Sequence, residues 1–464
     1  MSAFASTIDA WKREKGPLRI LSASGQLGYG IPEPAFRAGL ARKPHLIGAD
    51  MGSVDPGPYY LGAGKLATAR RSSKRDLGLA IVGAVRNRIP FILGTAGTGG
   101  GDPHLAETME IIREIAREND LNFRVATIGA EMPRDVVKAA VRAKKVTAIG
   151  PIEALTEAEV DGAARIVGQM GMEAFQRAID LEPDIIIAGR ACDTAIYATL
   201  PQRLGFPVGP ALQMAKIIEC ASLCCEGGGR DAMLGTLEGE SFVLESMNPN
   251  RRATPMSVAA HSLYEQADPL SVAEPEGVLY LADAKYEAVD ERRVRVSGGR
   301  WEPATQFSVK IEGATRIGAR AVLVAGSTDP VFIAKAQEIA ASVEAMIREL
   351  VPPNPKRPYE LFFRFYGLGV VGGQPVTTVP EEVGVLVECI GETEEEARAV
   401  AATAKQYLLH APFSGRISTA GNLGFPFTPP EMTAGDAYRF SVYHIMEVDD
   451  LAPLFPVSIE TIGR

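Results

Sequence analysis

Unbroken apolar runs that end in glycine or small polar residues recur in the first half of the chain. They lie at residues 18–24, 45–50, 89–101, 123–131, 146–151 and 184–193. The runs are rich in Ile, Leu and Val and do not alternate with polar residues, which is typical of strands buried on both faces. Amphipathic stretches between them, clearest at 105–120 and 163–179, predict helices. This alternation predicts a doubly wound α/β domain with a mostly parallel sheet over residues 1–233.

The pattern changes after residue 233. Segments between 234 and about 325 alternate polar and apolar residues, which predicts exposed antiparallel strands, and a helix is expected at about 330–350. We therefore expect residues 234–350 to form a β-rich extension of the same large region, closed by that helix. The segment VPPNPKRP (351–358) contains four prolines and is the predicted linker. Residues 359–464 are expected to form a small α+β domain.

Composition excludes several classes of protein. The chain has 464 residues, which favours two or three domains, and its 46% hydrophobic and 23% charged residues are typical of globular proteins. A net charge of −9 argues against a nucleic-acid surface. The first twenty residues lack the apolar core of a signal peptide, and no apolar stretch is long enough to span a membrane. Five cysteines in such a long chain fit a reducing compartment, so we expect a cytoplasmic protein.

Ionisable residues follow the predicted strands at their carboxyl ends, where ligands bind in open α/β sheets. Acid–base catalysis needs such side chains close together. The candidate catalytic residues are Asp50, Asp55, Asp102, His104, Glu131 and Asp193. Asp50 and Asp55 are also the candidate ligands of a divalent metal ion, if one is bound. Alternatively, Asp55 starts a turn, and His104 and Asp193 cap helices.

A glycine-rich loop at 94–101 precedes a predicted helix that begins near His104. Glycines let backbone N–H groups approach a ligand, and a helix N-terminus favours negative charge, so a phosphate or carboxylate site is expected here. A merely tight turn is the alternative. The loop fits neither the G-x-G-x-x-G nor the P-loop pattern, so we expect no nucleotide cofactor. The candidate substrate-binding residues in this region are Ser24, Gly25, Thr95, Gly97, Thr98, Gly99 and Gly100.

Four further residues are candidates for binding a substrate. Arg190 ends the last long apolar run, and its planar guanidinium suits a substrate carboxylate. Glu226 and Arg230 flank a second glycine-rich loop at 227–229. His261 and Glu265 lie four residues apart, on one face of a helix if the segment is helical, either as a functional pair or as a plain surface contact.

Several long sequence strings resemble those of the acyclic terpene utilisation (AtuA-type) family. They are GADMGSVDPGPYYLGAG (48–64), GTAGTGGGDPHLA (94–106), IIIAGRACDTA (185–195), TPMSVAAHSLYEQADP (254–269) and AYRFSVYHIMEVDD (437–450). The resemblance implies a place in the degradation of branched or terpenoid acids and their CoA thioesters. It also implies a hetero-oligomer with a short companion protein. It assigns no catalytic residues.

The residues and the resemblance together favour a catabolic enzyme, a lyase or hydratase that acts by acid–base chemistry on a small carboxylic acid or its CoA thioester. The alternative from another class is a non-catalytic acyl-CoA-binding or scaffold subunit of a multi-subunit enzyme. A weaker alternative is an ATP- or NAD-dependent enzyme with a divergent loop. We expect a homo-oligomer or a complex with the companion, and neither nucleic acid nor membrane as a partner.

Overall fold

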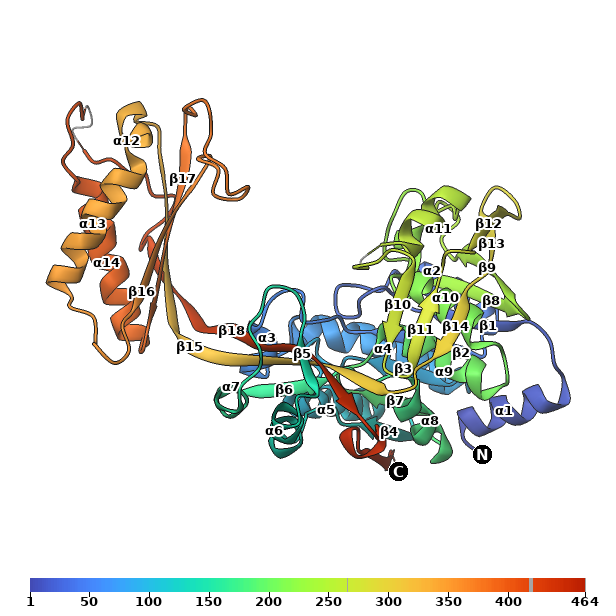
Figure 1. Cartoon of the computed structure of the whole chain (residues 1–464). Coiled ribbons are helices and arrows are strands. Elements are labelled where there is room, and N and C mark those ends of the chain that lie inside the picture. Colours follow the sequence, from blue (N-terminus) through green and yellow to red (C-terminus); the bar gives the residue numbers. More distant parts are fainter. Residues whose placement is uncertain (265, 417–419, 464) are drawn as a thin grey trace. The chain divides into compact units, whose positions relative to one another are not determined.

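The computed structural model describes residues 1–264, 266–416 and 420–463, and the chain divides into two compact units (Figure 1). Unit 1 contains residues 1–315 and 440–464, and unit 2 contains residues 316–439. The predicted division at 233 and at 351–358 differs from this one. The strand at residues 233–238 pairs with the first strand of the chain, and the last strand returns to the same sheet, so these segments share the core of unit 1.

A sheet of ten strands forms the centre of unit 1. Its five parallel strands are, in spatial order, β1 (Leu18–Ser22), β2 (Leu46–Asp50), β3 (Phe91–Gly94), β7 (Ile185–Ala188) and β4 (Phe123–Ile128). Antiparallel strands extend the sheet beyond β1 with β8 (Met233–Glu238), β9 (Ser241–Ser246), β13 (Arg293–Ser297) and β12 (Lys285–Ala288), and beyond β4 with β19 (Val457–Ile462). The predicted doubly wound α/β fold is confirmed.

Helices cover both faces of this sheet because successive strand residues point to opposite sides. Leu21 of β1 belongs to one hydrophobic core and Ile20 to the other. The first core is closed by α2 (Glu33–Ala41), α4 (Arg70–Asn87) and α5 (Asp102–Glu118). The second is closed by α1 (Ala3–Arg13), α8 (Met172–Asp180), α9 (Asp193–Arg203) and α10 (Val208–Ile218).

The remaining elements of unit 1 are short. The helices are α3 (Tyr59–Ala63), α6 (Arg134–Arg142), α7 (Glu157–Gly162) and α11 (Pro255–Ser262), with the single turns η1 (Ala221–Cys224) and η2 (Ala452–Leu454). Strands β10 (Ser271–Glu274), β11 (Gly277–Tyr280) and β14 (Arg300–Pro303) form a separate antiparallel sheet.

Two segments of the α/β region differ from their sequence predictions. The run at 146–151 forms β5 (Val146–Ala148), which pairs with β18 (Glu431–Val448) and lies outside the ten-stranded sheet. The segment 163–179, predicted as one helix, begins with β6 (Arg165–Gly168) and becomes helical only in α8. Strand β6 pairs with β15 (Phe307–Ser327), a long-range interaction that local periodicity cannot reveal.

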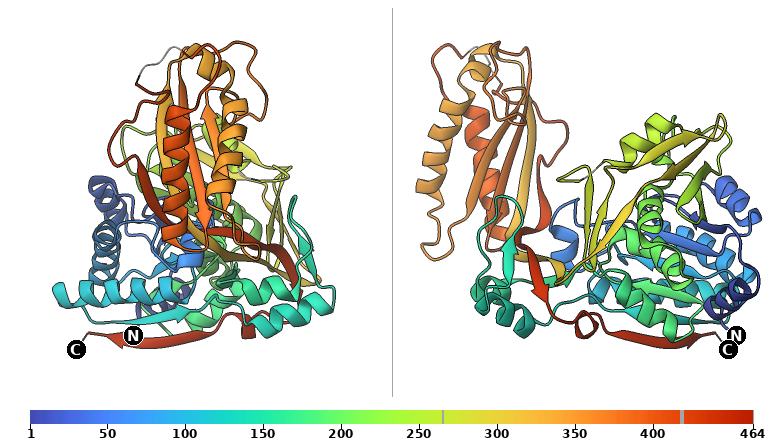
Figure 2. Two further views of the ribbon diagram at one scale, coloured as in Figure 1. Left: turned by 90° about the vertical axis from the view of Figure 1, so that its left-hand side faces the viewer. Right: turned by 45° about the vertical axis from the view of Figure 1, so that its right-hand side comes forward.

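Unit 2 has the order of elements β-α-β-β-α-β. Its first strand is the part of β15 that follows residue 315, and its last strand is the part of β18 that precedes residue 440. Between them come α12 (Pro330–Ala334), α13 (Ala336–Leu350), β16 (Glu360–Tyr366), β17 (Val383–Gly391) and α14 (Glu394–His410). The strand order β16-β17-β15-β18, with α13 and α14 packed together on one face, is that of ferredoxin-like domains (Figures 1 and 2). The proline-rich segment 351–358 joins α13 to β16 within this unit.

No helix among the described residues is long and apolar enough to cross a membrane.

Candidate active site

The parallel strands β3 and β7 are neighbours, and the chain leaves them toward opposite faces of the sheet. Helix α5 follows β3 on one face, and α9 follows β7 on the other. The point where crossovers diverge in this way is where ligands bind in open α/β sheets. The loops 95–101 and 189–192 meet there, since Thr95 N–H donates to Gly189 O at 3.0 Å and Arg190 N–H donates to Gly100 O at 3.1 Å.

The glycine-rich loop is packed tightly against the protein itself. Gly100 has φ +66°, and a Cβ there would lie 2.3 Å from the Arg190 backbone nitrogen; a Cβ at Gly99 would lie 2.6 Å from the His104 ring. Six backbone N–H groups of residues 95–101 already donate within the protein. Thr98 Oγ1 donates to Met51 O at 2.8 Å. The geometry therefore favours the tight-turn interpretation of this loop over an anion site.

The neighbouring loop after β1 is equally closed. Ser24 is buried, and its Oγ lies 3.5 Å from Gln26 O. A Cβ at Gly25 would lie 2.7 Å from Cys220 O. Thr95 Oγ1 is 3.4 Å from Ala191 N, so it ties the loops after β3 and β7 together.

His104 is completely buried, and both of its ring nitrogens contact backbone groups. Nδ1 accepts from Gly101 N–H at 3.2 Å, which leaves Nε2 as the donor to Tyr60 O at 3.0 Å. Burial lowers the pKa of the imidazole below its ordinary value. A neutral ring held at both nitrogens closes the first turn of α5, as the capping alternative predicts.

Glu131 and Asp102 lie together at the start of α5. Glu131 Oε1 accepts from the Asp102 N–H at 3.1 Å and lies 3.4 Å from Arg165 Nε. Burial and the Asp102 charge raise the pKa of the half-buried Glu131. Asp102 itself is exposed. The hydrogen bond from the Asp102 N–H to the Glu131 carboxylate fixes the start of α5.

Arg190 is buried, and its guanidinium holds a carboxylate of the protein itself. Nε and Nη2 donate to Glu312 on β15 at 2.7 and 3.4 Å, and Lys310 Nζ lies 2.9 Å from the same carboxylate. Burial alone would lower the pKa of Arg190, but the Glu312 charge raises it above its ordinary value. Burial alone would raise the pKa of Glu312, but Arg190 keeps it low. Glu312, which lies far from Arg190 in sequence, was not predicted.

The charges of Asp193 and of Arg190 both act on the carboxyl group of Asp50. Asp50 is the last residue of β2 and is buried, and Asp193 is the first residue of α9. Gly52 N–H donates to Asp50 Oδ2 at 2.5 Å, whereas Oδ1 has no hydrogen-bond partner among the described residues. Burial and the Asp193 charge raise the pKa of Asp50 well above its ordinary value, against the opposing charge of Arg190.

Two helices add buried polar groups next to this pair. Tyr197 lies one turn after Asp193 on α9, and its hydroxyl is 3.1 Å from Ser22 Oγ at the end of β1. On α10, Lys216 Nζ is 2.5 Å from Oε1 of Glu219, and both side chains are buried. Burial raises the pKa of Glu219 to about 8, although the Lys216 charge opposes this. The Asp193 charge acts on all three groups.

We refer to six of these residues as the carboxyl-end cluster. They are Asp50, Arg190, Asp193, Tyr197, Lys216 and Glu219. The α10 members were not predicted, although a signal for them exists in the sequence. Gln213, Lys216 and Glu219 recur every three residues in a stretch that is otherwise apolar.

Glu274 on β10 borders the cluster. It is buried, accepts a hydrogen bond from Thr194 Oγ1, and contacts the Cys192 thiol. Burial raises the pKa of Glu274 to about 7. Burial and the Glu274 charge also raise the pKa of Cys192, which argues against a thiolate nucleophile there.

Asp55 does not share the environment of Asp50. It is exposed, and its N–H lies 3.2 Å from Ser53 Oγ in a turn. Over the described parts of the chain, no group of three or more His, Cys, Asp and Glu side chains is arranged to hold a metal ion.

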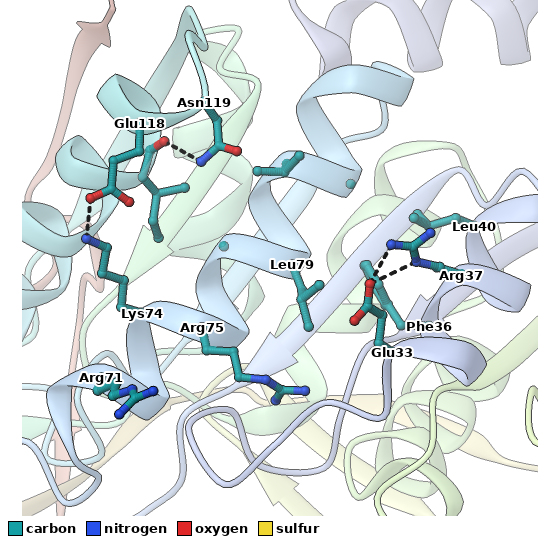
Figure 3. A pocket seen from close by; sticks show the side chains of 14 residues that line it. Glu33, Phe36, Arg37, Leu40, Arg71, Lys74, Arg75, Leu79, Glu118 and Asn119 are labelled. Atoms are coloured by element: carbon teal, nitrogen blue, oxygen red, sulfur yellow. Dashed lines mark hydrogen bonds and ion pairs between the residues drawn. The ribbon is translucent and has the colours of Figure 1, made fainter.

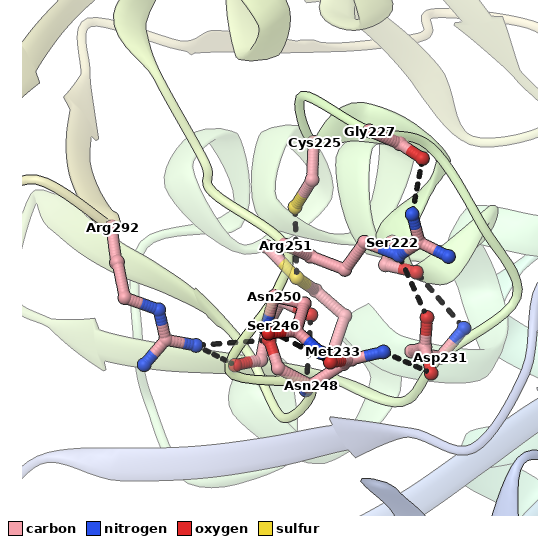
Figure 4. A network of polar contacts seen from close by, with 10 residues as sticks. All are labelled: Ser222, Cys225, Gly227, Asp231, Met233, Ser246, Asn248, Asn250, Arg251 and Arg292. Atoms are coloured by element: carbon pink, nitrogen blue, oxygen red, sulfur yellow. Dashed lines mark hydrogen bonds and ion pairs between the residues drawn. The ribbon is translucent and has the colours of Figure 1, made fainter.

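The second glycine-rich loop is closed by a polar network (Figure 4). Arg251 Nε donates to Asp231 at 3.1 Å, and its Nη1 donates to Gly227 O. Glu226 is exposed and pairs with Arg252 Nη2 at 2.8 Å, and Arg230 lies 4.9 Å over the Tyr29 ring. None of these contacts involves a residue of the carboxyl-end cluster.

His261, by contrast, is buried near that cluster, on α11. Its Nε2 has no hydrogen-bond partner among the described residues, and its ring stacks on Tyr264 at 5.5 Å. Burial and then the Lys216 charge lower the pKa of His261 to about 4. Glu265, its suggested partner, lies outside the described residues.

A groove of about 700 Å³ lies elsewhere, over α2, α4 and α5 (Figure 3). Among the described residues, its lining includes none of the predicted site residues. Two pairs of its charged groups contact one another: Arg37 donates to Glu33 at 2.5 Å, and Lys74 donates to Glu118 at 2.6 Å. We place the candidate active site at the carboxyl-end cluster, because buried groups with shifted pKa values gather there.

The fold and this cluster define a doubly wound α/β protein with buried ionisable groups at its topological switch point. The chain belongs to the acyclic terpene utilisation family AtuA, whose family model matches residues 85–427. This membership places it in the catabolism of acyclic terpenes. No curated protein and no solved structure matches the chain.

Proposed function

We propose that the protein is a catabolic enzyme that moves a proton at a carbon next to a carbonyl group, as lyases and hydratases do. Its substrate is a small branched or terpenoid-derived carboxylic acid or the CoA thioester of such an acid. The observation that carries the proposal is the buried carboxyl group of Asp50, on which the charges of the half-buried Asp193 and of Arg190 act where β3 and β7 diverge.

Two coupled carboxyl groups in one buried site do not both ionise readily. One then holds a proton while the other is ionised, so the pair supplies an acid and a base at the same place. Arg190, fixed by Glu312, keeps its positive charge beside the pair. Proton transfer needs no electron acceptor, and we therefore propose that no redox or nucleotide cofactor takes part.

The test is solvent deuterium exchange. Citronellic acid, an acyclic terpenoid acid, and its N-acetylcysteamine thioester are incubated with the protein in D₂O, and incorporation at the α carbon is followed by mass spectrometry. We expect exchange with the wild-type protein and a loss of about 10²- to 10⁴-fold in Asp50→Asn and Asp193→Asn. Asp55→Asn, a change on the same loop at an exposed position, is the matched control and should exchange normally.

Two outcomes contradict the proposal. One is exchange that survives in both Asp50→Asn and Asp193→Asn. The other is no exchange of either probe by the wild-type protein. Binding of the thioester without any exchange would instead support the non-catalytic acyl-CoA-binding subunit, which needs no acid–base pair.

A further inference from the structure

Strand β16 forms an outer edge of the sheet of unit 2 (Figure 1). All seven of its residues pair with β17 on one side, and no strand of the described residues pairs with it on the other. Outside the ladder with β17, the described part of the chain gives its backbone a single main-chain hydrogen bond, from Leu368 N–H to Phe365 O. The strand therefore presents unpaired N–H and C=O groups along its free edge.

The composition of this edge is unusual for one that stays free. Edge strands of soluble proteins carry charges, prolines or bulges that prevent another strand from adding to them. The sequence of β16, ELFFRFY, contains no proline, and its ladder with β17 runs without a bulge. Arg364 is the one charged residue inside the strand, and its Nη1 donates to Glu388 of β17 at 2.6 Å. An edge of this kind is expected to pair with another strand.

Apolar side chains are exposed along the same edge. Leu361 and Phe365 belong to the core under α13 and α14, so the alternate residues point to the other face of the sheet. Of these, Phe362 is 37% exposed and Tyr366 is 45% exposed. The loop after the strand adds four exposed valines, which are Val370, Val371, Val376 and Val379. Exposed apolar side chains that gather in one place mark a contact surface.

A groove of about 370 Å³ lies between α13 and β16. It is lined by Gln337, Ala340, Ala341 and Glu344 of the helix and by residues 361–364 of the strand, and residues 367–382 take no part in its lining. A strand that adds to a sheet edge points every second side chain to the same face, and these side chains need a space to enter. The groove provides that space on the helix side of the edge.

We infer that this edge is a dimer interface, in which β16 pairs antiparallel with β16 of a second copy of this chain about a two-fold axis at Phe363.

The strand is complementary to itself in this register. Phe363 is its middle residue, so a two-fold axis at this position pairs all seven residues. On the helix side, Leu361 then lies opposite Phe365 of the second copy, and the two Phe363 side chains lie opposite one another, next to the groove. Pairs of aromatic and branched apolar residues are those that stabilise neighbouring antiparallel strands.

The charges favour the same register. On the face away from the helices, Arg364 lies opposite Phe362 of the second copy, and Glu360 lies opposite Tyr366, so no like charges face one another. Within one copy, the Arg364 guanidinium already lies 5.1 Å from the centre of the Phe362 ring, and the second copy brings a further ring beside it. Because the contact is isologous, one dimer pairs this edge in both copies and growth stops there.

The test is the molar mass of the full-length protein, measured by light scattering after size exclusion over a range of concentrations. Phe362→Lys sets a positive charge opposite Arg364 of the second copy, and Phe362→Glu sets a negative charge at the same exposed position. Met432→Lys is the matched control, since Met432 is an exposed apolar residue on β18 of the same sheet. The melting temperature of each variant verifies that it is folded.

We expect the wild-type protein to have twice the mass of one chain. The dissociation constant of the dimer should be about tenfold higher in Phe362→Lys than in Phe362→Glu, because the repulsive pair occurs twice across the axis. Met432→Lys should dimerise like the wild-type protein.

A disulfide tests the register. In Phe363→Cys, the two introduced thiols face one another with Cβ atoms about 5 Å apart, so oxidation with diamide should give a covalent dimer on a non-reducing gel. In Tyr366→Cys they lie roughly 20 Å apart along the paired strands and should not crosslink. The wild-type protein, with its own five cysteines, gives the background.

Three results would overturn the inference. A wild-type protein that stays monomeric at every concentration overturns the homodimer and leaves this edge for a different chain. Equal dissociation constants in Phe362→Lys and Phe362→Glu place the dimer contact elsewhere on the molecule. Absence of the covalent dimer in Phe363→Cys, or its formation in Tyr366→Cys, overturns the two-fold axis at Phe363.

Discussion

Replacement of Glu274 by glutamine tests whether the site holds protonated carboxyl groups at neutral pH. Glu274 is buried on β10, and burial raises its pKa from an ordinary value near 4.5 to about 7. As the pH rises from 4.5 to 7, the unfolded chain loses this proton and the folded protein keeps it. The unfolded state is therefore favoured progressively, and stability falls over this interval.

The size of the effect follows from the two pKa values. The interval between 4.5 and about 7 corresponds to roughly 3 kcal/mol of unfolding free energy, present below pH 4.5 and lost once the pH passes 7. Glutamine has nearly the same shape and does not titrate. Between pH 5 and pH 8.5, the wild-type protein should therefore lose roughly 2–3 kcal/mol of unfolding free energy relative to Glu274→Gln.

The assay is urea unfolding at several pH values, followed by tryptophan fluorescence. The two tryptophans, Trp11 and Trp301, both lie in unit 1, so the signal reports unfolding of the unit that contains Glu274. Glu240→Gln, at an exposed turn of the same unit, is the control and should follow the wild-type profile. The reasoning is refuted if the profile of Glu274→Gln is also parallel to that of the wild-type protein.

Two further predictions concern the packing that positions the site. Arg190→Met leaves Glu312 buried without its bidentate partner and should lower the free energy of unfolding, measured in urea, by about 3–5 kcal/mol. The double variant Arg190→Met/Glu312→Gln should recover part of this loss. Equal losses in the two variants would contradict the coupling between Arg190 and Glu312. Gly100→Ala places a Cβ 2.3 Å from the backbone nitrogen of Arg190, at a residue with φ +66°, and should lower the melting temperature strongly. Gly78→Ala on α4, where the added Cβ meets open space, should instead stabilise the protein by about 0.5–1 kcal/mol.

The fold could be predicted from the sequence as far as local pattern determines it. Five of the six apolar runs form the parallel strands, because a strand buried on both faces leaves an unmistakable composition. The insertion of β7 between β3 and β4 could not be predicted, since it depends on pairing between distant segments. The return of β19 to pair with β4 has the same origin, and so does the difference in domain division.

The candidate site could be predicted in outline only. Asp50 and Asp193 follow strands, and the rule for strand ends is enough to find them. The same rule also selects His104, because the sequence does not show that two backbone groups bind its nitrogens. Glu312 was missed because it comes from β15, which lacks the parallel-strand pattern. Lys216 was not predicted, because amphipathic periodicity indicates the apolar face of a helix and does not mark single polar residues in a helix that is buried on all sides.

A cluster that serves stability alone is not expected to have the composition seen here. Apolar residues of similar volume usually stabilise a core at least as well as a buried ion pair. Where ion pairs are kept for structure, each charge needs a partner, as Arg190 and Glu312 provide for one another. The region around Asp50 instead contains more carboxyl groups than cations, and burial keeps protons on some of them at a pH where an ordinary carboxyl group is ionised. Stability gains nothing from such groups, whereas an enzyme that exchanges protons with a carbon acid requires them.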